Sequence, residues 1–145
     1  MDRRNFIKSS CGACAAIATG FIPAVILEAC KTPLGVVKTS SQNNIVKITL
    51  SEFGQSNYKL VRVSNYDYDL AVEKKADGSF ETIVLMCTHA GQPLTKTGDS
   101  YYCTMHGSTF DHDGHVTKGP AEKDLLKLNY KTDKDFLYIE LKKLS

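Results

Sequence analysis

Hydrophobic and polar residues alternate in short runs over most of the chain after residue 44. Runs with a period of two, bounded by turn residues, are typical of β-strands that bury one face. Almost no segment in this part of the chain shows the 3.6-residue period of a helix. The predicted strands lie at 45–50, 58–63, 69–73, 80–86, 100–103, 109–112, 115–118, 125–130 and 136–141.

Turn residues separate these runs and indicate antiparallel pairing. Asp77-Gly78 and Asp113-Gly114 are Asp-Gly pairs, which favour tight hairpin turns because both central residues can take positive φ. The last two runs are expected to form a closing hairpin around 131–135. The pattern therefore predicts an all-β domain of nine or ten short strands.

The first 44 residues differ from the rest. A short basic opening at 1–8 precedes an apolar stretch at 11–27, which is the layout of an export signal, so 1–29 are excluded from the fold. The polar segment 30–44 shows no periodicity and is interpreted as a flexible tether. The folded domain is then expected to occupy 45–145.

Two short motifs suggest how the chain is exported. Arg3-Arg4 resembles a twin-arginine motif, whose pathway moves proteins that are already folded. Residues 27–30 resemble a bacterial lipobox, in which cleavage before Cys30 leaves a lipid-modified amino terminus. The expected location is the periplasm or a membrane surface, as a bacterial lipoprotein. An ordinary cleaved signal and an uncleaved membrane anchor are the alternatives.

Size and charge restrict the function classes. A chain of 145 residues and 16.0 kDa holds one compact domain. The formal net charge is +2, and there is neither a basic stripe with interleaved aromatics nor a Gly-rich phosphate loop. Nothing therefore indicates a nucleic-acid partner.

Two Cys/His pairs carry the candidate chemistry. Cys87 and His89 are two residues apart, and Cys103 and His106 are three apart. In a two-iron, two-sulfide cluster of the Rieske kind, one iron takes two cysteines and the other takes two histidines. A single zinc ion takes all four ligands and does not require one Cys and one His in each loop. The pairing favours the cluster.

The surrounding residues strengthen this interpretation. Segments 87–91 and 103–111 resemble the two cluster-binding loops of Rieske iron–sulfur proteins, and 119–121 resembles their third, proline-bearing loop. The resemblance implies a [2Fe-2S] cofactor of the Rieske type. It also implies an antiparallel β sandwich or barrel base that carries an inserted cluster-binding lobe, at about 84–120.

The resemblance assigns a role to each of the four ligand residues. Cys87 and Cys103 would hold the inner iron as thiolates, while His89 and His106 would bind the outer iron and leave imidazole nitrogens near the surface. The residues that the resemblance places around the cluster are Gly91, Gly107, Ser108, Phe110 and Pro120.

Several of these neighbours predict the redox properties. Ser108 resembles the serine whose hydroxyl bonds a bridging sulfide, whereas Phe110 stands where high-potential members carry a tyrosine. Gln92 and Met105 stand where the quinol-oxidising class has a cysteine pair. An intermediate reduction potential is expected. Ala90, Pro93, Leu94 and Pro120 are expected to form an apolar rim for transient docking.

Three functions are compatible with the sequence. The first is one-electron transfer in an exported, membrane-tethered protein, without catalytic residues of its own. The second is the small iron–sulfur subunit of a larger oxidoreductase, with a cytochrome, a quinol-oxidising complex or a molybdoenzyme as redox partner. The third is a zinc-stabilised lipoprotein without a redox role. The carboxylates and histidines at 111–115 are interpreted as a hairpin turn.

Overall fold

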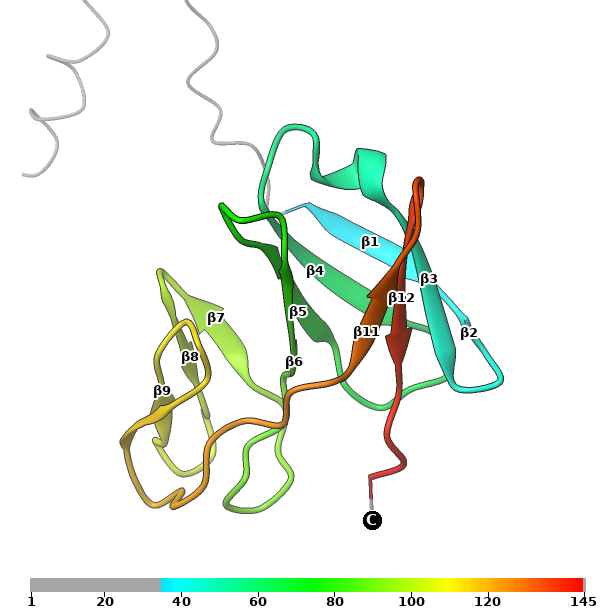
Figure 1. Cartoon of the computed structure of the whole chain (residues 1–145). Helices are drawn as coiled ribbons and strands as arrows, with labels where there is room; N and C mark the ends of the chain where they lie inside the picture. The colour runs from blue at the N-terminus through cyan, green and yellow to red at the C-terminus, as the bar shows by residue number, and fades with distance from the viewer. Residues whose placement is uncertain (1–34, 145) are drawn as a thin grey trace, which may run out of the picture. The chain divides into compact units, whose positions relative to one another are not determined.

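The structure is a computed structural model, and it describes residues 35–144 (Figure 1). The predicted export signal at 1–29, the lipidation candidate Cys30 and the start of the tether lie outside the described residues. The described part of the chain forms twelve strands in three four-stranded sheets, together with one short 3-10 helix, η1 (Leu50–Phe53). The predicted all-β class is confirmed.

The first base sheet has the strand order β1-β4-β5-β6. Val61 and Val63 of β4 are buried while Arg62 between them is exposed, which is the alternation expected of a sheet with one buried face. β1 runs parallel to β4, and the other pairs are antiparallel. The strands are β1 (Val36–Thr39), β4 (Tyr58–Val63), β5 (Leu70–Lys74) and β6 (Phe80–Val84).

The second base sheet has the order β11-β12-β3-β2 and packs against the first. Val46 and Ile48 of β3 and Leu137 and Ile139 of β12 point inward, where they join side chains of β4, β5 and β6 in one core cluster. Burying a side chain of this size contributes about 1.5–3 kcal/mol. The strands are β2 (Ser41–Gln42), β3 (Ile45–Thr49), β11 (Tyr130–Thr132) and β12 (Phe136–Glu140).

The predicted tether is wrong from Val36 onward, because this segment belongs to the base. β1 pairs with β4 in parallel, and β2 pairs with β3 through a two-residue turn at Asn43 and Asn44, whose φ angles are 52° and 62°. Asparagine tolerates the left-handed conformation that such hairpins require. The polar run that suggested a linker is therefore a hairpin turn between two short strands.

The closing hairpin also differs from its prediction. Its first strand begins at Tyr130, whereas 125–129 run alongside β6. Val84 N donates to Leu126 O and Leu128 N to Thr82 O, each at 2.9 Å. The apolar residues of 125–129 are thus buried by a neighbour distant in sequence, a pairing that the local pattern does not encode.

The inserted lobe is a small antiparallel sheet with the order β10-β9-β8-β7. Its strands are β7 (Thr95–Thr97), β8 (Ser100–Tyr102), β9 (Thr109–Phe110) and β10 (Val116–Lys118). The sequence pattern did not predict β7, whose three residues are partly or fully exposed. A second core cluster, which includes Leu85, Tyr101 and Phe110, fills the space beneath the lobe.

An ion-pair cluster joins the lobe to the base. Lys75 Nζ lies 3.0 Å from Glu73 Oε2 and 2.9 Å from Glu81 Oε2, both on the base, and 3.1 Å from Asp113 Oδ1 in the β9–β10 turn of the lobe. The group is half-buried, so it helps to fix the lobe on the base.

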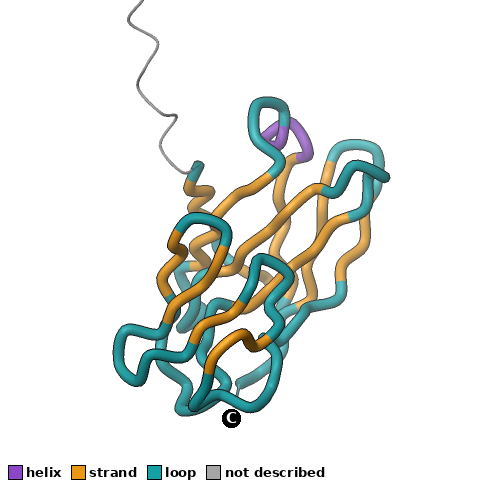
Figure 2. Tube along the Cα trace, turned by 90° about the vertical axis from the view of Figure 1, so that its left-hand side faces the viewer, coloured by secondary structure: helices purple, strands orange, loops and turns teal. Residues whose placement is uncertain are grey.

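The ligand loops and the start of β1 lie at opposite ends of the domain. The loops after β6, β8 and β10 gather at the lower end in Figure 1, whereas β1 begins at the upper end. Figure 2, turned by 90°, places η1 at the end opposite the C-terminus. In the described part of the chain, no helix is long and apolar enough to cross a membrane.

Candidate metal centre

The two Cys/His loops have the same backbone geometry. In the first, Cys87 N donates to Gln92 O at 2.7 Å and Gly91 N to Cys87 O at 2.8 Å. In the second, Cys103 N donates to Ser108 O and Gly107 N to Cys103 O, each at 2.9 Å. Each cysteine therefore opens an equivalent six-residue turn.

The strand pairing that closes each loop is also equivalent. Met86 pairs with Pro93 around the first loop, and Tyr102 pairs with Thr109 around the second. In both loops the pair lies one residue before the cysteine and six residues after it. The histidine is the element that differs, since it is two residues after the cysteine in one loop and three in the other.

A glycine with positive φ turns each loop back toward its strand. Gly91 has φ 65° and Gly107 has φ 79°, a region that other L-residues rarely adopt. A Cβ added at Gly107 would meet nothing within 4 Å, so the backbone conformation is what requires glycine there. The two predicted glycines thus shape the loops.

The four candidate ligands separate into an inner and an outer pair. Cys87 and Cys103 are fully buried, whereas His89 and His106 are exposed. The centroids of the two imidazole rings are 4.9 Å apart, in an edge-to-face arrangement. Among the described residues, no three His, Cys, Asp or Glu side chains surround one point where a single metal ion could bind.

The surroundings of Cys103 favour a thiolate. Burial acts to raise the pKa of its thiol, but backbone N–H groups of His106 and Met105 and the Cys87 thiol point at the sulfur and hold the pKa below its ordinary value. The thiolate is the form of cysteine that binds metal.

The third predicted loop is tied to both ligand loops. Ala121 N donates to Ser108 Oγ at 3.0 Å, and the Thr88 hydroxyl donates to Lys123 O. Ser108 and Ala121 are buried, while Pro120 is exposed. The sequence predicted the proximity of these three loops through the family resemblance alone, because the contacts link residues 13 and 35 positions apart.

Tyr68 supports the site from outside the three loops. It lies between β4 and β5 on the base, and its hydroxyl donates to Gly91 O at 2.6 Å in a half-buried position. No local signal identifies it, since the partner is 23 residues away.

The structure gives mixed outcomes for the predicted rim. Ala90, Pro93 and Pro120 are exposed as expected, but Leu94 is buried in the second core and does not belong to the rim. Met105 has 64% of its surface exposed, which makes it the most exposed large apolar side chain of the described residues.

Two further predictions concern Phe110 and the segment 111–115. Phe110 is fully buried in the core that holds both cysteines. The segment at 111–115 is a turn, as predicted: Asp111 N donates to His115 O, and Gly114 N donates to Asp111 O. His112 and His115 each face a neighbouring aspartate of the same turn, at 3.1 and 3.3 Å.

Comparison with known proteins assigns the family. Residues 45–131, more than half of the chain, match the Rieske [2Fe-2S] domain. The chain belongs to the Rieske [2Fe-2S] family. Its cofactor is therefore a Rieske-type [2Fe-2S] cluster, and family membership indicates electron transfer through that cluster.

Curated relatives cover the Rieske domain only in part. The mitochondrial cytochrome b-c1 complex subunit Rieske of Aotus azarae is 34% identical over 84 residues, which cover 56% of this chain and 30% of the relative. The Bos taurus subunit is 36% identical over 75 residues, covering 50% of this chain and 27% of the relative. The chain thus spans less than a third of the length of these relatives.

A solved structure shares the fold. The plasma-membrane Rieske protein PetC3 from the cyanobacterium Synechocystis PCC 6803 superposes with a TM-score of 0.52 at 21% identity. The match covers 66% of this chain and 99% of that protein. At this level of identity the likeness establishes the Rieske fold, and it confirms the predicted base with an inserted lobe.

The residues present fit the cluster. Two buried thiols 16 positions apart in sequence converge in one core cluster, and N–H groups directed at Cys103 favour its thiolate. Two imidazoles lie side by side at the surface beyond them. This donor set, with thiols inside and imidazoles outside, is the one that a Rieske cluster uses.

Proposed function

We propose that Cys87 and Cys103 ligate the inner iron, that His89 and His106 ligate the outer iron, and that the protein transfers single electrons. The observation that carries this proposal is the equivalence of the two loops, which bury their cysteines and expose their histidines next to each other. A bound [2Fe-2S] cluster supplies a reversible one-electron change.

The residues around the site have distinct tasks in this proposal. The buried thiols, Phe110 and Ala121 exclude water from the inner side. The exposed imidazoles form the face that a redox partner contacts, and the exposed Met105 extends that face with apolar surface.

Ser108 is suited to tune the potential. Its hydroxyl oxygen accepts a hydrogen bond from Ala121 N, which leaves its own proton available to donate into the site. A donor to a cluster sulfur stabilises the more negative, reduced state and raises the potential. Phe110 provides no such donor, so we expect a potential between those of the respiratory-complex type and all-cysteine ferredoxins.

We also propose that the protein is exported and tethered to a membrane. The twin-arginine-like pair Arg3-Arg4 and the lipobox-like sequence before Cys30 support this part of the proposal. On this view the domain works as an electron carrier at the membrane surface in the periplasm.

A second candidate function is that of an iron–sulfur subunit in a larger oxidoreductase. The observation that favours it is the similarity to subunits of the cytochrome b-c1 complex. Co-purification of a cytochrome or a molybdopterin subunit with the full chain would support this alternative, whereas isolation of a stable monomer that exchanges electrons would favour the carrier.

Electron paramagnetic resonance of the reduced protein tests the proposal. We expect a rhombic spectrum with a low average g value, together with two irons and two sulfides per chain. The Cys103→Ser variant should lose the signal, whereas the exposed His112→Ala variant, which changes a histidine of the nearby turn, should retain it. One zinc per chain without a signal would contradict the redox role and support a zinc-stabilised lipoprotein.

A further inference from the structure

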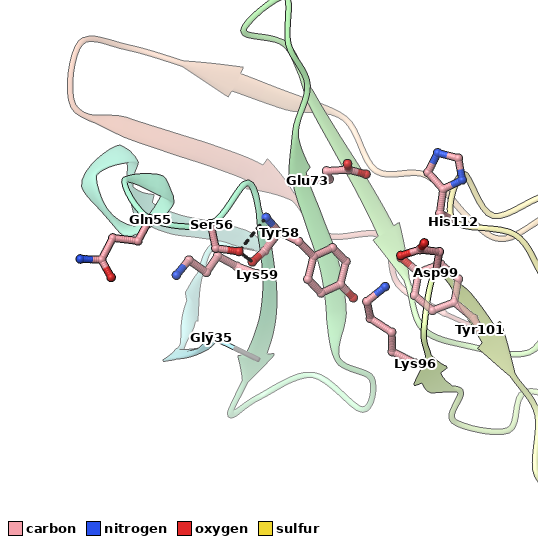
Figure 3. A pocket seen from close by; sticks show the side chains of 10 residues that line it. All are labelled: Gly35, Gln55, Ser56, Tyr58, Lys59, Glu73, Lys96, Asp99, Tyr101 and His112. Carbon is pink, nitrogen blue, oxygen red and sulfur yellow. Dashed lines mark hydrogen bonds between the residues drawn. The ribbon is translucent and has the colours of Figure 1, made fainter. Parts of the chain in front are cut away.

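A pocket of about 510 Å³ lies at the junction of base and lobe (Figure 3). Tyr58 and Lys59 of β4 contribute from the base, and Lys96 of β7 and Tyr101 of β8 contribute from the lobe. None of the candidate cluster ligands lines it. Its volume is in the range of pockets that bind small organic groups.

Tyr58 offers an unpaired hydrogen-bond donor to this pocket. Its hydroxyl oxygen is buried and makes no hydrogen bond of normal geometry to any described residue. Burial, and then the neighbouring Tyr101, raise the pKa of Tyr58, so the phenol remains a donor at neutral pH. A buried polar group without a partner costs about 1–3 kcal/mol, which a ligand oxygen could recover.

One ammonium group lies close to this donor, and a second lies on the far side of Tyr58 (Figure 3). Lys96 Nζ is 4.5 Å from the centroid of the Tyr58 ring, and Figure 3 shows the two side chains pointing toward one another. Lys59 Nζ lies against Gly35, so closely that a Cβ on that glycine would be 2.7 Å away. Lys96 and the phenol together offer donors for an anionic oxygen group, and Lys59 adds a second positive charge to the pocket lining.

Carboxylates on the pocket wall favour a ligand that also carries a positive charge. Glu73 is already paired with Lys75, but Asp99 forms no ion pair with any described residue. A simple anion would face this carboxylate without compensation, whereas a ligand with an ammonium group would neutralise it. The lining thus matches a zwitterion better than free phosphate.

The position of the pocket suggests the source of such a ligand. Gly35 lines the pocket and is five residues after Cys30, so the chain can separate them by at most ~17 Å. A lipid on Cys30 would therefore hold this end of the domain at the membrane surface. In Figure 1, β1 begins at the end opposite the two ligand loops and the third loop.

We propose that the pocket binds a phospholipid headgroup that contains both a phosphate and an ammonium, with Lys96 and Tyr58 on the phosphate and Asp99 on the ammonium. The proposal rests on the lipidation proposed at Cys30, which brings the pocket to the bilayer. Headgroup binding would hold the exposed histidines away from the membrane, where a soluble redox partner can reach them.

Titration of the full chain in a non-ionic detergent tests this site. Glycerophosphoethanolamine is added in one arm, and glycerophosphoglycerol, the monoester phosphoethanolamine and inorganic phosphate are added in the others. Calorimetry should show saturable binding that is tightest for glycerophosphoethanolamine. The Lys96→Met variant should weaken it about tenfold, and the Lys59→Met variant, which removes a charge farther from the phosphate, should weaken it less.

Lys38→Met is the matched control, because this lysine lies on β1 close in sequence to Gly35 but does not line the pocket. Its affinity should stay within about twofold of wild type. Equal weakening by all three variants, or the absence of saturable binding, would refute the pocket assignment. Tighter binding of inorganic phosphate or of the monoester would refute a lipid source.

The state of Cys30 is measured separately, by mass spectrometry of the membrane fraction. An unmodified Cys30 would overturn the lipid anchor and the orientation that follows from it. The titration tests the pocket independently of that result, and neither measurement depends on whether the cluster transfers electrons.

Discussion

The hydrogen bond from Tyr68 to the first ligand loop leads to a prediction about cluster retention. Replacing Tyr68 by Phe keeps the ring but removes the hydroxyl that donates to Gly91 O at 2.6 Å. The Gly91 carbonyl would then lack its half-buried partner. Loss of such a bond costs about 1–2 kcal/mol.

This cost can be expressed as a thermal shift. For a domain of about 110 described residues, with an unfolding entropy of about 2.1 cal/mol/K per residue, 1–2 kcal/mol lowers the Tm by ~4–9 °C. The lost bond also holds the loop that carries Cys87 and His89, so the loop should open more often. Iron loss at a fixed temperature below the Tm should accelerate about five- to thirtyfold if opening limits it.

Tyr66→Phe is the matched control for this prediction. Tyr66 belongs to the same segment between β4 and β5, but its hydroxyl donates at 3.1 Å to Lys142 O in the C-terminal segment. The control should lower the Tm without changing the rate of iron loss, followed by visible absorbance. Equal iron-loss rates in the two variants would show that Tyr68 has no specific role in holding the ligand loop.

Three further outcomes are expected. Ser108→Ala should lower the reduction potential by tens of millivolts, measured by redox titration. Each tenfold loss in the relative stabilisation of the reduced state corresponds to about 59 mV. An unchanged potential would exclude the hydroxyl as a donor to the cluster. Gly107→Ala should lower the free energy of unfolding by about 1 kcal/mol through backbone strain alone, and it should reduce the cluster content. Gly98→Ala, at φ 58° in the β7–β8 turn, should lower the free energy of unfolding by as much without affecting the cluster. The pKa of Asp133 lies below 3.8, because its carboxylate accepts hydrogen bonds from backbone N–H groups, Asp135 N first, and from the Tyr138 hydroxyl. The ionised Asp133 therefore contributes its full stabilisation above pH 3.8. This stabilisation is lost as the pH falls through the lowered pKa of the folded state. Urea unfolding between about pH 5 and 2 should therefore show a steeper loss of stability for wild type than for Asp133→Asn, and parallel curves would contradict this.

Local sequence patterns predicted the parts of the fold that depend on local chemistry. The alternation at 58–63 coincides with β4, since its buried valines alternate with more exposed polar residues. The Asp-Gly pair also predicted the turn at Asp113-Gly114, where Gly114 has a positive φ of 83°. Both features are determined by a few adjacent residues.

Contacts between distant segments could not be predicted in the same way. β1 is recognised as a strand only through its pairing with β4, and the apolar residues of 125–129 pair with β6 and not with their own hairpin neighbour. Leu94 is an apolar residue next to the first ligand loop and was expected in the rim, yet it is buried in the second core cluster. Each of these outcomes depends on long-range packing, which overrides local preference.

The same distinction applies to the candidate centre. The Cys/His spacing and the two glycines identified its loops, because each loop is a short turn with its own sequence signature. Tyr68, the link between Thr88 and Lys123, and the pocket between base and lobe carry no such signature. Their partners are far apart in the chain, so the three-dimensional structure was needed to find them.

The equivalent geometry of the two ligand loops has a consequence for how the protein matures. Each loop is closed by a pair of residues only seven positions apart, Met86 with Pro93 and Tyr102 with Thr109. Closing so short a segment costs little chain entropy and takes well under a microsecond in flexible peptides. Both halves of the centre can thus form early during folding, before the sheets are complete. The two candidate half-sites would then exist as local turns, and completing the centre would require only their mutual approach.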